Sequence, residues 1–106
     1  MIGMGKVNIG EVMTFPHPKA DKEQVMKIAE EEHEVFSAWE KLEEIKQMRK
    51  FNYASWAQVQ MYKRFLMNEC ADLITATANL LDALGVDDMR GAMKACEERN
   101  RQRGRL

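Results

Sequence analysis

Two pairs of acidic residues carry the clearest chemistry in this 106-residue chain. Glu31 and Glu34 form one pair at i, i+3, and Glu69 and Asp72 form a second pair with the same spacing. An ionised carboxylate among apolar side chains costs several kcal/mol unless it is protonated, paired or bound to a cation. Four converging carboxylates would form a cage of hard oxygen ligands, which suits Mg²⁺ or Mn²⁺ and leaves positions for water and phosphate.

The positions of these acids follow from about 100° of rotation per helical residue. Glu31 lies at the edge of the first apolar sector, and Glu34 lies one step further round. Glu69 lies near the centre of the second sector, and Asp72 lies on its flank. The first sector consists of Val25, Ile28, Val35, Phe36, Trp39 and Leu42, and the second of Tyr62, Phe65, Leu66, Leu73, Ala76, Leu80 and Ala83.

Two structural interpretations compete with a metal site. Charge runs such as residues 30–34 are usually solvated helix surface. A buried salt bridge from Glu69 to Lys27 or Lys63 would also neutralise the carboxylate that lies in the apolar stripe.

Local sequence features predict where the helices begin and end. Residues 1–20 contain three Gly and both prolines, which indicates an extended lead-in. Asp21 is the predicted N-cap of a first helix, with Gln24 in capping-box position, and this helix should extend to about Lys50. Residues 51–54 are the predicted turn.

A second helix is predicted from Ser55, which has a glutamine three places later, to Gly85 in the C′ position. One of the aspartates at 87–88 should cap a third helix that ends at Gly104. That helix carries Met89, Ala92, Met93 and Cys96 on one side.

The fold class predicted by these elements is all-α. Residues 21–106 should form an antiparallel helical bundle of two long helices plus a shorter C-terminal helix. Hydrophobic residues make up 45% of the chain, which is more than one such hairpin can cover. We therefore expect oligomerisation to complete the bundle, as a homodimer or a dimer of dimers.

Composition also bears on location. The chain has no run of about 20 apolar residues, and its start lacks the basic segment and apolar core of a signal peptide. We expect a cytoplasmic protein with no membrane partner. Cys70 and Cys96 match no metal-ligand spacing or disulfide framework, which favours reduced thiols.

The formal net charge of −1 combines two opposed blocks. Residues 21–44 hold nine acids against three lysines, and residues 90–106 hold six bases against two acids. No uniform field results, so we expect no stable nucleic-acid partner. An acidic segment that binds a cation and a basic segment that contacts phosphates would together suit a metal–nucleotide site.

The two acidic motifs resemble those of the MazG-like, all-α nucleoside triphosphate pyrophosphohydrolase superfamily. The first motif is Lys-Ile-Ala-Glu-Glu-Glu-His-Glu at 27–34, and the second is Glu-Cys-Ala-Asp at 69–72. Residues 97–104 also look like the basic closing segment of several members. The resemblance implies that the metal ligands are Glu31, Glu34, Glu69 and Asp72.

The activity implied by the resemblance is Mg²⁺-dependent hydrolysis of a nucleoside triphosphate between the α and β phosphates. The products would be a monophosphate and pyrophosphate, and the role would be cleaning of the nucleotide pool. Glu30 and Glu31 would be the catalytic residues, with Glu30 supporting the metal ligands or orienting water.

Protein cations should then cover the phosphates. The candidate substrate-binding residues are Lys27, Lys94, Arg99 and Arg103, with Asn79 as a partner for the sugar or base. Phe36 and Trp39 could stack on a base, but we expect both to be core residues first.

Two other functions remain open. A di-iron carboxylate bundle needs Glu-x-x-His on two helices, and only Glu30 to His33 supplies that motif, on the side away from the apolar sector. A non-catalytic helical module could bind nucleic acid or a protein partner through the basic tail, residues 90–106. That second interpretation leaves Glu69 unexplained.

Overall fold

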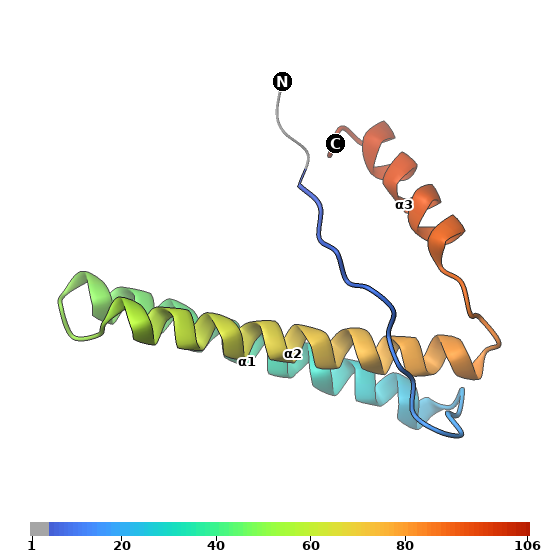
Figure 1. Ribbon diagram of the computed structural model, residues 1–106, viewed down its shortest axis with the longest axis horizontal. Helices are drawn as coiled ribbons and strands as arrows, with labels where there is room; N and C mark the ends of the chain where they lie inside the picture. Colours follow the sequence, from blue (N-terminus) through green and yellow to red (C-terminus); the bar gives the residue numbers. More distant parts are fainter. Residues whose placement is uncertain (1–4) are drawn as a thin grey trace.

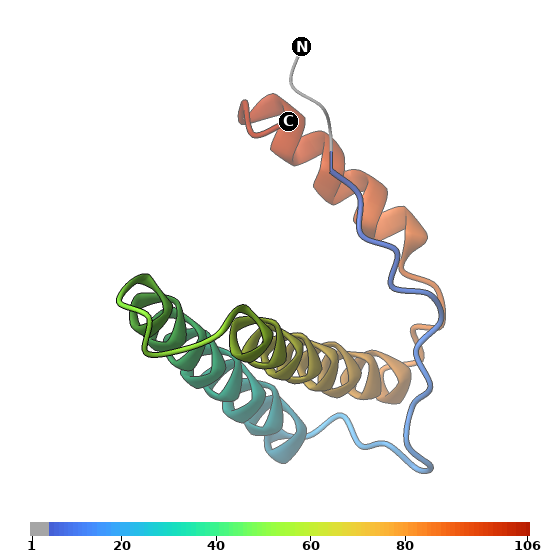
Figure 2. The same ribbon diagram turned by 60° about the vertical axis from the view of Figure 1, so that its left-hand side comes forward.

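The computed structural model describes residues 5–106, which form three helices and no strand (Figure 1). These are α1 (Lys22–Lys50), α2 (Trp56–Ala83) and α3 (Arg90–Gln102). The first two pack as an antiparallel hairpin, whereas α3 projects from the end of α2 (Figure 2) and has no Cα atom within 8 Å of either. The all-α prediction is confirmed. None of these three helices combines the length and apolarity needed to cross a bilayer.

Side-chain caps begin the two long helices where the sequence predicts. Asp21 Oδ1 accepts from the Gln24 backbone N–H at 2.9 Å. Ser55 and Gln58 form a complete capping box, with bonds of 2.8 and 3.1 Å. The box predicted at Asp21 is only half formed, because the Gln24 side chain instead donates to the Ala76 carbonyl at 2.8 Å. That bond ties the start of α1 to α2.

Glycines in the left-handed region end the last two helices. Gly85 has φ 82°, and the Val86 N–H donates to the Leu81 carbonyl at 2.9 Å, which closes the end of α2. Gly104, with φ 74°, follows α3 in the same way. Both residues occupy a backbone conformation that glycine adopts without a steric penalty.

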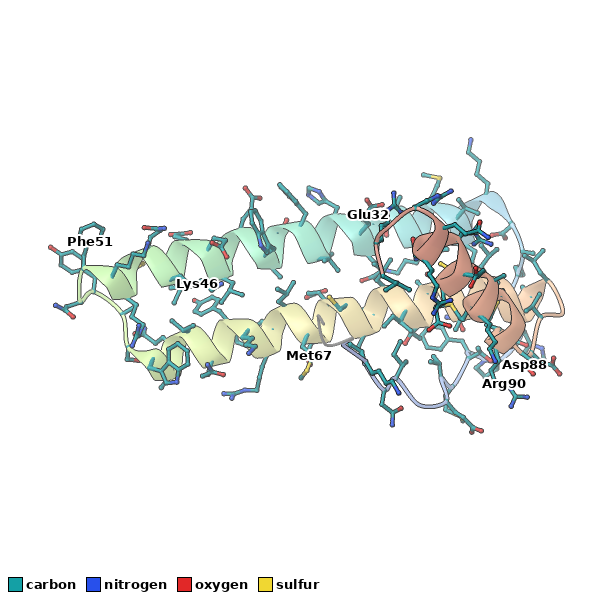
Figure 3. The ribbon with its side chains drawn as sticks, turned by 90° about the horizontal axis from the view of Figure 1, so that it is seen from above. Glu32, Lys46, Phe51, Met67, Asp88 and Arg90 are labelled. Carbon is teal, nitrogen blue, oxygen red and sulfur yellow. The ribbon has the colours of Figure 1, made fainter. Side chains whose placement is uncertain are left out.

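The start of α3 differs from the prediction. Its N-cap is Met89, which makes no side-chain cap bond. Asp88 nevertheless accepts from the Arg90 backbone N–H at 3.0 Å and from the Arg90 guanidinium at 2.8 Å (Figure 3). Asp88, the residue before the N-cap, therefore accepts a hydrogen bond from a backbone N–H of the first turn of α3 that has no partner within the helix.

The main cluster of buried hydrophobic side chains lies in the half of the hairpin next to the turn, and Ala76 is buried separately, nearer the end of α2. Leu42, Ile45 and Val59 are buried, and Ala54, Tyr62 and Leu66 pack against them. The expectation that Phe36 and Trp39 are core residues is wrong for the single chain, because they are 54% and 46% exposed. Two helices bury only the facing stripe of each, so side chains further round remain in solvent.

Residues 5–20 of the lead-in form no helix or strand, bend at Pro16 and His17, and cross α2 near its end (Figure 1). The first four predicted lead-in residues lie outside the described part of the chain. The Phe15 N–H donates to Asn79 Oδ1 at 2.8 Å, and Thr14 Oγ1 donates to Asp82 Oδ2 at 2.6 Å. Asn79 is 3% exposed, so this contact holds the lead-in through a buried amide.

Replacing Asn79 tests this anchor. We expect Asn79→Ala to lower the free energy of unfolding by about 1–2 kcal/mol, because it leaves the Phe15 N–H without its acceptor. Urea denaturation measures the loss, and hydrogen exchange of the Phe15 amide should become faster. Thr77→Ala, at an exposed α2 position, is the control and should cost about 0.5 kcal/mol or less. Unchanged stability and exchange in Asn79→Ala would contradict the anchor.

Candidate metal centre

Three of the four predicted ligands meet between α1 and α2. Glu31, Glu69 and Asp72 each place one carboxylate oxygen within 4.8 Å of the others. Glu31 comes from α1 and the other two come from successive turns of α2. The antiparallel packing of the hairpin creates this cluster, since it brings acids 38 to 41 positions apart in sequence to the same level.

Lys27 lies one helical turn before Glu31 and pairs with it. The Lys27 Nζ to Glu31 Oε1 distance is 2.9 Å, and the Glu31 side chain is 12% exposed. A weaker contact of 3.7 Å reaches Glu30. The hydrogen bond and charge of Glu31 raise the pKa of Lys27 above its ordinary value, so the ammonium stays charged beside the cluster.

Glu69 has no ion pair within residues 5–106. The alternative of a salt bridge to Lys27 or Lys63 is therefore wrong. Lys27 pairs instead with Glu30 and Glu31 of its own helix. Partial burial, followed by the charges of Asp72, Glu34 and Glu31, raises the pKa of Glu69 above its ordinary value. The ionised cluster is thus under electrostatic stress that a cation would relieve.

The remaining acids of the first motif lie outside the cluster. Glu34 is exposed and is not one of the three converging residues, although its charge acts on Glu69. Glu30 is exposed and lies near Lys27. His33 is also exposed, as its position on the helix predicted. The structure thus brings together three of the four ligands that the motifs imply.

The predicted substrate-binding residues lie in three different places. Lys27 is beside the cluster, as described. Asn79 is buried, and its carboxamide oxygen already accepts from the Phe15 N–H, which places it in the lead-in anchor. Lys94, Arg99 and Arg103 belong to α3 and its C-cap, away from both hairpin helices in the single chain.

The donor set fits a hard divalent cation. Carboxylate oxygens are the ligands that Mg²⁺ and Mn²⁺ prefer. Ligands on opposite sides of Mg²⁺ are about 4.2 Å apart, given metal–oxygen distances of about 2.1 Å. Only one pair among three octahedral ligands can be opposite, and adjacent ligands are about 3.0 Å apart, so oxygens within 4.8 Å of one another would approach by up to about 1.8 Å on binding the ion. Glu31, Glu69 and Asp72 would hold the ion.

Comparisons of the chain with protein-family models, with curated proteins and with solved structures found no match.

Sequence reasoning missed the part that Gln24 and Lys27 play in positioning the cluster. Gln24 bonds α2 at Ala76, one turn beyond Asp72, and so fixes the spacing of the two helices at this end. Lys27 holds the Glu31 carboxylate. The i, i+4 spacing of Lys27 and Glu31 could have indicated the ion pair, but no local pattern indicates a bond across 52 residues.

The raised pKa of Glu69 predicts a pH-dependent stability in metal-free protein. The folded chain holds this proton more tightly than the unfolded chain, so the group lowers stability as pH rises from its ordinary pKa of 4.5 through the raised value. We expect Glu69→Gln to be more stable than the wild type at about pH 7 in chelator, and this advantage to vanish at about pH 4. Thermal denaturation across this range measures the difference.

Glu40→Gln is the matched control, because Glu40 is an exposed acid on α1 and is outside the cluster. Its stability difference from the wild type should not change in the same way with pH. Equal pH profiles for Glu69→Gln and the wild type would contradict the stress at Glu69.

Proposed function

We propose that this chain is a divalent-cation-dependent nucleoside triphosphate pyrophosphohydrolase. The observation that carries the proposal is the convergence of Glu31, Glu69 and Asp72 between two antiparallel helices. These are three of the four ligand positions that the MazG-like motifs imply. A cluster of this chemistry, built across two helices from both motifs, favours the hydrolase over a solvated acidic surface.

The observed sites favour this proposal over the alternatives. A di-iron bundle needs histidine ligands, and the cluster contains none. A binding module that acts only through its basic tail leaves the convergence of Glu31, Glu69 and Asp72 unexplained.

The carboxylates would act on a bound metal–triphosphate complex. When bound by Glu31, Glu69 and Asp72, a divalent cation would supply charge neutralisation for the polyphosphate and would make water more acidic. Glu31, held by Lys27, would keep its carboxylate fixed for the ion. Glu30, the exposed residue directly before Glu31, would accept the proton of the water that attacks the α-phosphorus, as pyrophosphate leaves with the electrons of the broken bond.

Phosphate contacts beyond the metal would come from cations. Lys27 lies closest to the cluster, and it can exchange its bond with Glu31 for a phosphate when a divalent ion neutralises that carboxylate. Lys94, Arg99 and Arg103 remain predicted phosphate ligands, and α3 and its C-cap lie away from both hairpin helices in the single chain. We also propose that the protein is a homodimer or a dimer of dimers.

Pyrophosphate release is the direct test. Purified protein with Mg²⁺ or Mn²⁺ is incubated with ribo-, deoxy- and oxidised nucleoside triphosphates, and we expect metal-dependent release from at least one. Glu69→Gln and Asp72→Asn should lower the rate by about 100-fold or more. Removing a metal ligand should lower activity by more than removing a residue that only hydrogen-bonds to a ligand. Each variant keeps the size of the native side chain.

Glu43→Gln is the control for this experiment, because Glu43 lies on α1 close to the turn and pairs only with Lys46. It should retain the wild-type rate. No release from any nucleotide, together with unchanged metal binding in Glu69→Gln, would overturn the proposal. Salt-sensitive nucleic-acid binding without turnover would favour the binding module instead.

A further inference from the structure

The described chain is much less compact than a folded domain of its length. Its radius of gyration is 17.2 Å, whereas a compact chain of 106 residues has about 13 Å. The chain is extended both by its long hairpin and by α3, which stands off the hairpin as an arm (Figure 2). Both the arm and the hairpin therefore expose the apolar surface that each would bury in a finished fold.

The hairpin has one apolar flank, which we define by Val25, Phe36 and Trp39 of α1 and Cys70 and Ile74 of α2. At about 100° per residue, these positions lie on the opposite side of the α1–α2 contact from the carboxylates. The three α1 residues are 53%, 54% and 46% exposed, and the rings of Phe36 and Trp39 are 6.0 Å apart. Such a surface is typical of a helix-packing site.

The arm has the length and the surface to cover this flank. Its apolar side includes Met89 and Met93, which are 37% and 60% exposed. Thirteen helical residues span about 20 Å, and the distance along α1 from Val25 to Trp39 is about 21 Å. Charge is complementary as well, since residues 21–44 carry nine acids against three lysines and residues 90–106 six bases against two acids.

The connection between α2 and α3 directs the arm away from its own hairpin. The turn at Gly85 is closed by the Val86 N–H bond to the Leu81 carbonyl. The lead-in is bonded next to this turn through Thr14 and Asp82. From this end of the hairpin the arm projects away from both long helices (Figures 1 and 2).

We propose that the chain forms a dimer by mutual exchange of this arm. The apolar side of α3 from each chain packs on the apolar flank of the partner's hairpin, and the basic residues of the arm face the acids of the partner's α1. This assembly goes beyond the proposed hydrolase and does not depend on it, because neither the flank nor the arm contains a cluster carboxylate.

Cross-linking between distinguishable full-length chains tests the exchange. In a background with Cys70→Ala and Cys96→Ala, one chain carries Ala29→Cys beside the flank, and a tagged chain carries Ala92→Cys on the apolar side of the arm. We expect a short bismaleimide to join the two chains when they are mixed. A single chain with both cysteines should give covalent dimers, not an internally linked monomer.

Lys94→Cys replaces Ala92→Cys in the control, because position 94 lies about 160° round α3 from position 92. This control chain should not be joined to the Ala29→Cys chain. An internal link in the double-cysteine chain would overturn the proposal in favour of an arm that folds back. Efficient linking of Ala29→Cys chains to each other, without any link to the arm, would show that hairpins pair directly.

A charge on the arm provides a second measurement in the otherwise native chain. Met93→Glu should weaken the dimer by at least tenfold in dissociation constant, measured by sedimentation equilibrium, because it places a carboxylate against the apolar flank and the acids beside it. Gln102→Glu adds the same charge on another side of α3 and should leave the constant within about twofold. Monomeric wild-type protein at micromolar concentration would also contradict the proposal.

Discussion

The apolar contact between α1 and α2 fixes the register of the two helices, and so determines which residues of α1 face which residues of α2. Leu42 and Ile45 pack against Val59 close to the turn, and from there each further turn of one helix meets an earlier turn of the other. A shift of one helical turn, about 5.4 Å, would separate Glu31 from Glu69. The candidate metal centre is therefore a consequence of packing that occurs elsewhere in the hairpin.

The polar end of the hairpin combines opposing electrostatic effects. Lys27 offsets the charge of Glu31, while Glu69 and Asp72 have no such ion pair in the described chain. An entirely apolar contact would stabilise the hairpin more, since carboxylates close together destabilise one another. Retaining acids here therefore costs stability, and under the proposed function this cost would be offset by binding of a cation.

Features set by near neighbours in sequence were predicted well, and features set by distant parts were not. The cap at Ser55 and the glycine stop at Gly85 depend on a few adjacent residues, so their types identify them. The helical rotation per residue placed Glu69 near the centre of the apolar sector of α2 for the same reason, and its side chain is half-buried in the structure. The exposure of Trp39 and the engagement of Asn79 depend on how many helices pack together and on where the lead-in lies, which no local pattern specifies.

The antiparallel hairpin also has a consequence for the order in which the chain folds. Val59 follows Leu42 by only 17 positions, whereas Gln24 and Ala76 are 52 apart. Because the entropy cost of closing a loop grows with its length, the contacts near the turn should close first and extend towards the helix ends. The repelling carboxylates then meet only after the apolar contact has formed, so their repulsion should speed local opening more than it slows the initial collapse.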